Sequence, residues 1–115
     1  MVTIALKGMR FHSFHGYYAD EQSVGNTYEL DVMLRTPLEL SSLDDELTNT
    51  INYESVYQLC KTEMAKPVRL IETVAKSIHD RMMDFERVTY CKISIRKMNP
   101  LLGGLVDHAL VEIES

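Results

Sequence analysis

The chain has 115 residues and a formal net charge of −5, from 12 Lys and Arg residues and 17 Asp and Glu residues. This length fits a single domain over residues 1–115, and the scattered basic residues argue against nucleic acid and against ligands with several phosphates. No stretch approaches the roughly 18 apolar residues of a membrane span, so we expect no membrane partner. The two cysteines form no motif, which favours reduced thiols in a cytoplasmic protein.

The first third of the chain predicts two strands. The first, Thr3–His15, changes the face of its apolar side chains at Gly8, where a bulge would explain the switch. The second, Thr27–Leu38, alternates apolar and polar residues, as expected for a sheet with one solvated face. Residues 15–26 between them are too many for a tight turn, and loops of this kind often carry function.

The middle third changes to a helical period. After residues 39–50, which show no clear period, apolar residues recur at helical spacing over 56–64 and again over 71–85. Each repeat forms one apolar stripe, so we expect two amphipathic helices on the same face of the sheet. Asn52 is placed to cap the first of them.

The last third returns to a period of two, over residues 90–97 and 109–114. The order of elements is therefore ββααββ. The sequence predicts an α+β fold in which a four-stranded antiparallel sheet carries two helices packed on one face.

Lys97 continues the apolar alternation of the third strand. If that strand extends to Lys97, the side chain enters from the apolar face, where a lysine is costly unless it has a partner or a task. If the strand ends at Arg96, Lys97 turns into solvent instead. The spacing alone favours neither alternative.

Two other polar side chains fall at predicted helix starts. Glu72 lies in the first turn of the second helix, where the helix dipole stabilises a carboxylate, and this structural explanation is favoured on the pattern alone. Tyr53 follows Asn52 at the start of the first helix, where ordinary packing accounts for an aromatic residue. Neither residue predicts a site by itself.

The histidines do not predict a metal site. His12 and His15 are three residues apart on a strand and so point to opposite faces, while His79 and His108 lie in other elements without ligand spacing. The sequence also has no glycine-rich phosphate loop, no serine-hydrolase elbow and no zinc-protease motif. We therefore expect no metal.

Several short motifs together resemble the dihydroneopterin aldolase family. Their order and spacing follow the ββααββ pattern through nearly the whole chain. The motifs are Leu6-Lys7-Gly8-Met9-Arg10-Phe11, Phe14-His15-Gly16 followed by Glu21, Asn52-Tyr53, Leu70-Ile71-Glu72 and Lys97-x-Asn99-Pro100.

The resemblance implies the tunnelling fold, in which the sheets of several subunits join edge to edge and oligomerise into a β-barrel. Such proteins are homo-oligomers, tetramers that stack into homo-octamers, and this assembly pairs the two edges that an open four-stranded sheet leaves free. The resemblance also implies sites between subunits, with Tyr53 approaching from the neighbour of the chain that provides Glu72 and Lys97.

The implied activity is that of an aldehyde-lyase in folate biosynthesis. The family cleaves 7,8-dihydroneopterin, a pterin, into 6-hydroxymethyl-7,8-dihydropterin and glycolaldehyde by a retro-aldol step. The C6=N5 imine of the ring can accept the electrons that the cleavage releases, so we expect no cofactor. The protein has to supply recognition, proton transfer and electrostatic support.

Binding roles follow from the same resemblance. Glu72 matches the glutamate that binds the amino-pyrimidine edge of the pterin, where a carboxylate accepts two parallel hydrogen bonds. Main-chain groups around Ile51 and Ile71 match the other contacts with the ring. Tyr53 matches a tyrosine that stacks on the ring.

Catalytic roles are implied for three residues. Lys97 matches the lysine near N5 and the reacting side chain, which moves a proton through water. Tyr53 matches the tyrosine that helps to protonate the enol intermediate. Glu21, which fits the spacing better than its neighbour Asp20, matches the glutamate that interacts with this lysine.

The segment after Lys97 departs from the family pattern. Where the family has a proline-rich segment, this chain continues Met98-Asn99-Pro100-Leu101-Leu102-Gly103-Gly104, which predicts a more flexible loop. Two other functions stay open: a 2′-epimerase acting on dihydroneopterin or its triphosphate, alone or as a side activity, and a non-catalytic pterin-binding oligomeric module. The scattered basic residues weigh against the triphosphate.

Overall fold

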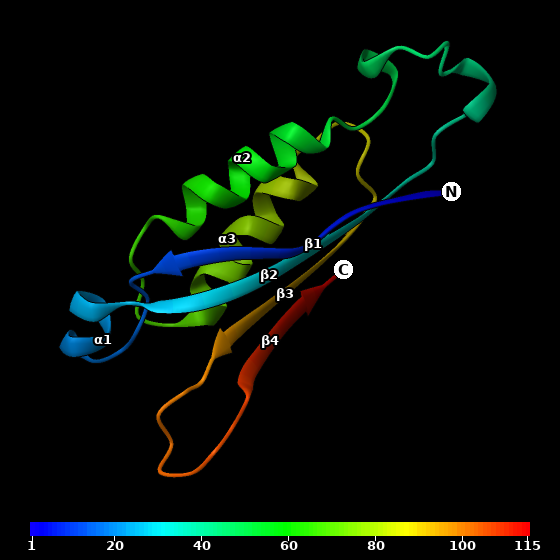
Figure 1. The fold of residues 1–115 in the computed structure, drawn as a ribbon. Helices are drawn as coiled ribbons and strands as arrows, with labels where there is room; N and C mark the ends of the chain where they lie inside the picture. Colours follow the sequence, from blue (N-terminus) through cyan, green and yellow to red (C-terminus); the bar gives the residue numbers. More distant parts are fainter.

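The computed structural model describes residues 1–115, and its sheet has the antiparallel strand order β1-β2-β3-β4 (Figure 1). Three α-helices and two short 3-10 turns complete the fold. The strands are β1 (Val2–Ser13), β2 (Asn26–Thr36), β3 (Tyr90–Met98) and β4 (His108–Glu114). The helices are α1 (Ala19–Val24), α2 (Tyr53–Met64) and α3 (Ile71–Met83), and the turns are η1 (Leu40–Ser42) and η2 (Leu47–Asn49). The predicted α+β class and four-stranded antiparallel sheet are confirmed.

The predicted bulge in β1 lies at Gly8. The pairing register with β2 shifts between Leu6 and Met9, and Gly8 adopts a φ of 72°, which a residue with a side chain rarely adopts. The backbone N–H of Gly8 donates a hydrogen bond to Asp31 Oδ1 at 2.7 Å. Because the bulge adds a residue, the apolar side chains on both sides of Gly8 can face the helices.

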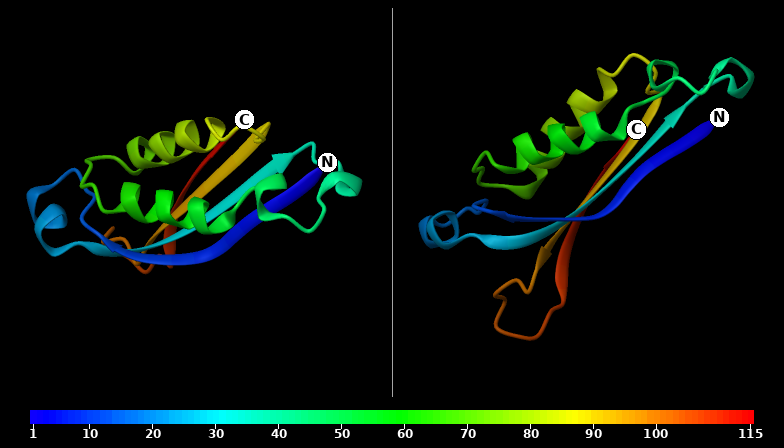
Figure 2. Two further views of the ribbon diagram at one scale, coloured as in Figure 1. Left: turned by 90° about the horizontal axis from the view of Figure 1, so that it is seen from above. Right: turned by 45° about the horizontal axis from the view of Figure 1, so that its top comes forward.

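Helices α2 and α3 cover one face of the sheet, as Figure 2 shows from two directions. Asn52 caps α2 as predicted, because its Oδ1 accepts a hydrogen bond from the backbone N–H of Glu54 at 2.9 Å. The apolar stripes of both helices pack on the sheet. The core between these layers includes Val56, Cys60, Met64, Val74, Ile78 and Met82 from the helices and Leu30, Val32, Leu34, Ile93 and Ile95 from the strands.

Two free thiols lie in this core. Cys60 on α2 and Cys91 on β3 are both fully buried and form no disulfide. Loss of solvation disfavours the thiolate, so burial raises the pKa of each thiol to about 12.

The two helices run in opposite directions, so their first residues lie at opposite ends of the molecule (Figures 1 and 2). One end carries α1, the α2–α3 connection and the start of α3. The other end carries the start of α2 and both termini. A helix of this length spans roughly 18 Å, which separates Tyr53 from Glu72 within a chain.

Some predicted boundaries are wrong by a few residues. β1 ends at Ser13 and not at His15, because the chain turns away there and Gly16 pairs with the α2–α3 connection instead. β2 ends at Thr36, before Pro37, which has no N–H to donate to the sheet. Helix α3 ends at Met83, so Phe85 lies beyond it. The six-residue helix α1, within the segment 15–26, was not predicted.

The sheet has two free edges, along β1 and β4. Its uncovered face carries charged side chains, among which Arg96 forms ion pairs with Asp31 at 3.0 Å and Glu29 at 3.7 Å. No helix is both long enough and apolar enough to span a membrane.

Candidate active site

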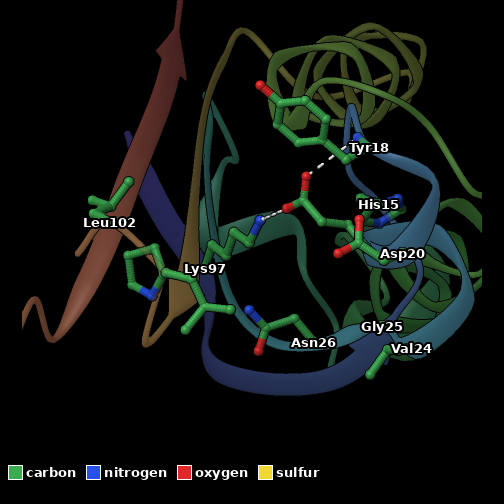
Figure 3. Close-up of a pocket in the computed structure, with 11 residues that line it drawn as sticks. His15, Tyr18, Asp20, Val24, Gly25, Asn26, Lys97 and Leu102 are labelled. Carbon is green, nitrogen blue, oxygen red and sulfur yellow. Dashed lines mark hydrogen bonds and ion pairs between the residues drawn. The ribbon is translucent and has the colours of Figure 1, made fainter. Parts of the chain in front are cut away.

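A cavity of about 600 Å³ lies at the end of the molecule that carries α1 (Figure 3). Its walls come from the segment between β1 and β2 and from the end of β3 with the loop that follows. The volume is in the range that holds a small organic molecule. The residues that line it include His15, Glu21, Lys97, Pro100, Leu101 and Leu102.

Lys97 reaches this cavity from within β3. The strand continues to Met98, so Lys97 keeps the parity of Ile93 and Ile95, which face the helices. It pairs in register with Tyr28 on β2, and its side chain is only 18% exposed. The strand therefore holds the lysine on the apolar face. Of the two alternatives that the sequence left open, the one in which the strand extends to Lys97 is the one observed.

Lys97 Nζ donates a hydrogen bond to Glu21 Oε2, and a dashed line marks this contact in Figure 3. The other carboxylate oxygen of Glu21 accepts a hydrogen bond from the backbone N–H of Tyr18 at 3.3 Å. The hydrogen bond from Lys97 outweighs partial desolvation and lowers the pKa of Glu21. The carboxylate is therefore ionised and fixed in orientation, while Asp20 makes no such contact with the lysine.

Gly16 allows Glu21 to approach this closely. A Cβ atom on Gly16 would lie 2.3 Å from Glu21 Cβ, so no other residue fits without a shift of the backbone. The N–H of Gly16 donates to the carbonyl of Val68 at 2.8 Å, and its carbonyl accepts from Gln22 Nε2 at 2.8 Å. The first bond ties the loop to the segment that leads into α3, and the second closes the loop onto α1.

His15 lines the cavity and packs against the buried Tyr28. The Tyr28 hydroxyl donates a hydrogen bond to the backbone carbonyl of His15 at 3.0 Å, and the two rings meet edge to face with centroids 5.1 Å apart. Burial, together with the charge of Glu21, raises the pKa of Tyr28 to about 12. Desolvation lowers the pKa of His15 and so favours its neutral form.

From the sequence, His15 was rejected as a metal ligand and was named as part of the Phe14-His15-Gly16 motif, but no role in a site was predicted for its side chain. Its place in that motif, at the start of the long segment between the first two strands, was the signal that it belongs to a site. Its burial could not be read from the pattern, because it depends on packing against Tyr28 of the next strand. The structure contains no group of three or more His, Cys, Asp or Glu side chains that could hold a metal ion.

The other predicted site residues do not line this cavity. Ile71 and Glu72 open α3 close to the loop held by Gly16, and Glu72 is exposed. Ile51 is buried and Tyr53 is 59% exposed. Tyr53 is the first residue of α2 and Ile51 just precedes it, and the start of α2 lies at the opposite end of the helix pair. A single chain therefore brings Glu21 and Lys97 together but leaves Tyr53 far from them.

The loop after Lys97 forms the apolar wall of the cavity. Pro100 is buried, whereas Leu101 is fully exposed and Leu102 largely so. Gly103 adopts a φ of 82°, which turns the loop back toward β4. The cavity thus presents an ammonium–carboxylate pair on one side and aliphatic groups on the other. This arrangement can bind an uncharged, partly polar molecule and exchange protons with it.

Comparisons with known proteins agree on one family. Residues 4–114 match the family model described as dihydroneopterin aldolase. A dihydroneopterin aldolase of Streptococcus pyogenes is 34% identical over 119 residues, which cover 99% of this chain and 98% of that protein. One of Bacillus subtilis is 30% identical, with 98% and 96% covered.

A solved structure supports the fold. The crystal structure of E. coli dihydroneopterin aldolase in complex with neopterin superposes with a TM-score of 0.84. The two chains are 13% identical, and the match covers 98% of this chain and 99% of the other. At this identity the likeness shows a shared fold.

Proposed function

The chain belongs to the dihydroneopterin aldolase family, and on that premise we propose that it cleaves 7,8-dihydroneopterin into 6-hydroxymethyl-7,8-dihydropterin and glycolaldehyde. The observation that carries this proposal is the Lys97–Glu21 pair in a cavity of about 600 Å³. The pair supplies a proton donor next to an ionised acceptor in a partly enclosed space. Such a pair is suited to acid–base chemistry on a small molecule.

The substrate itself provides the electron sink. Removal of the proton from the C2′ hydroxyl turns C2′–O into the carbonyl of glycolaldehyde as the C1′–C2′ bond breaks. The electron pair of that bond passes through C6 to N5, which takes up a proton. Protonation of the resulting enol at C1′ and loss of the proton from N5 give the hydroxymethyl product. The protein has only to move protons and stabilise charge.

Lys97 and Glu21 would serve the reacting side chain. Lys97 would pass protons through water between the C2′ hydroxyl and N5. Glu21 would orient the ammonium group, because its carboxylate is already held by the N–H of Tyr18. The low exposure of both side chains strengthens their interaction relative to one in open solvent.

Glu72 and the main chain near Ile71 would bind the ring at the start of α3. The exposed carboxylate of Glu72 is free to accept two hydrogen bonds from the amino-pyrimidine edge. We expect Tyr53 and the main chain near Ile51 to come from a neighbouring subunit, because they belong to the start of α2, at the far end of their own helix pair. The free edges of β1 and β4 support edge-to-edge assembly into a tetramer or octamer.

The charge of the cavity favours the unphosphorylated substrate. Lys97 is the one lysine or arginine that lines it, and this lysine is already paired with Glu21. A triphosphate would need several more cations. The two buried free thiols also support a reducing compartment, the cytoplasm.

The purified protein, incubated with 7,8-dihydroneopterin, tests this proposal when its products are separated. We expect equal amounts of glycolaldehyde and 6-hydroxymethyl-7,8-dihydropterin. Formation of the 2′-epimer, dihydromonapterin, without glycolaldehyde would replace the aldolase with the epimerase. Tight binding of neopterin with neither product would instead identify a non-catalytic binding module.

A further inference from the structure

His15 is a buried polar side chain whose ring has no partner in the protein. The residue is 1% exposed and lines the cavity beside Glu21, yet neither Nδ1 nor Nε2 makes a hydrogen bond. A buried donor or acceptor without a partner costs about 1–3 kcal/mol. The ring therefore has hydrogen-bonding capacity that a ligand or a bound water can satisfy.

The backbone holds His15 in place without using its ring. Its carbonyl accepts the hydrogen bond from the Tyr28 hydroxyl at 3.0 Å, and the next residue, Gly16, donates to Val68 at 2.8 Å. The edge-to-face contact with the Tyr28 ring orients the imidazole. Both ring nitrogens are thus positioned in advance, and the protein leaves them without a hydrogen-bond partner.

We infer that His15 hydrogen-bonds the 2′ or 3′ hydroxyl of the trihydroxypropyl side chain of the substrate, and so selects pterins that carry this side chain. The inference rests on the proposed function and adds a specificity residue to it. His15 shares its cavity with Glu21 and Lys97, where the reacting side chain would lie, and not with Glu72 at the ring-binding position.

The chemistry of the ring fits a hydroxyl group. A neutral imidazole presents one N–H donor and one acceptor nitrogen, and a hydroxyl group both donates and accepts. Desolvation lowers the pKa of His15, which keeps this neutral form at the pH of the cell. The aliphatic side chains of Leu101 and Leu102, on the loop wall, offer no competing hydrogen bond.

A pair of unreactive ligands isolates the side-chain hydroxyls. Neopterin carries the full trihydroxypropyl chain, whereas 6-hydroxymethylpterin has the same ring without the 2′ and 3′ hydroxyls. The dissociation constant of each ligand is measured for the unmodified protein, His15→Phe and His15→Gln. We expect His15→Phe to reduce the preference for neopterin about five-fold, the equivalent of one hydrogen bond. His15→Gln, which keeps a donor and an acceptor, should restore part of it.

His12→Phe is the matched control, because His12 lies three residues earlier, is exposed and does not line the cavity. Its ratio of the two affinities should not change. An unchanged ratio in His15→Phe would overturn the inference even if the melting temperature falls. Should neither variant fold, the ring resonances of His15 in the unmodified protein decide: they must shift more with neopterin than with 6-hydroxymethylpterin. If the unmodified protein binds neither ligand and cleaves nothing, the proposed function itself fails.

Discussion

The ammonium group of Lys97, near the end of β3, donates a hydrogen bond to Glu21, which lies 76 residues earlier in the chain. Two distant segments of the sequence therefore meet at the end of the sheet. The contact depends on Gly16, since a side chain there would displace Glu21. It also gives the lysine the partner that its apolar surroundings require.

Replacement of Lys97 tests the proton-transfer role. We expect Lys97→Ala to slow glycolaldehyde release about a hundred- to ten-thousand-fold, the usual contribution of a general acid or base. Affinity for neopterin should change little, because the ring contacts lie elsewhere. Lys92→Ala is the control, since Lys92 is on the same strand but on the opposite face of the sheet. Full turnover by Lys97→Ala would disprove the assignment.

Replacement of Glu72 should weaken binding of the pterin ring, whereas replacement of Lys97 should slow turnover and leave binding nearly unchanged. Loss of a carboxylate that accepts two hydrogen bonds should weaken neopterin binding about a hundred-fold, measured by calorimetry. Glu54→Ala is a close control, because Glu54 is the second residue of α2 as Glu72 is of α3. Both variants lose the same interaction with a helix dipole, so equal effects on binding would contradict a specific role for Glu72.

Mixed oligomers test whether Tyr53 comes from a neighbour. Tyr53→Phe and Lys97→Ala chains, each slow alone, should regain activity when unfolded together and refolded as a mixture. With random assembly, roughly a quarter of the sites would then combine both normal residues. A mixture of Lys97→Ala with Glu21→Gln should stay slow, because these two residues serve one site from the same chain. Recovery of activity in the second mixture, or no recovery in the first, would contradict a site shared between subunits.

The environment of Glu63 should make the stability of the fold depend on pH. It is buried, and although desolvation alone would raise the pKa of Glu63, hydrogen bonds from Lys66 and Ser77 and the charge of Arg81 lower it below the ordinary value of 4.5. A lowered pKa stabilises the fold at pH values above 4.5, and this contribution is lost as pH falls through the lowered pKa. Glu63→Gln should reduce the free energy of unfolding at neutral pH by about 2 kcal/mol.

The Glu63→Gln variant should also lose less stability on acidification than the unmodified protein does. Denaturant unfolding at several pH values and one chain concentration measures both effects. The exposed Glu39→Gln is the control. Parallel pH curves for the Glu63→Gln variant and the unmodified protein would show that Glu63 does not control acid stability.

The sequence predicted the sheet and the two long helices because their side-chain periods are clear over many residues. The bulge at Gly8 was also predictable, because the apolar side chains of the strand change from one face to the other at that residue. Helix α1 was missed because six residues, none of them buried, show no apolar period. Lys97 stayed ambiguous until the pairing with Tyr28 showed that β3 continues past it.

The site was harder to predict than the fold. The contact between Lys97 and Glu21 agrees with the spacing that favoured Glu21 over Asp20. The burial of His15 depends on contacts between segments far apart in the chain, which no local pattern encodes. The separation of Tyr53 from Glu72 follows from the antiparallel packing of α2 and α3, and so required the tertiary structure.

Cys60 and Cys91 are buried between the helices and the sheet, so their reaction with a thiol reagent reports separation of these two layers. The thiolate is the form that reacts with alkylating reagents, and neither thiol ionises or meets solvent while the helices cover the sheet. Cys60 belongs to the helix layer and Cys91 to the sheet. The rate at which each is alkylated in native buffer therefore measures how often the two layers separate.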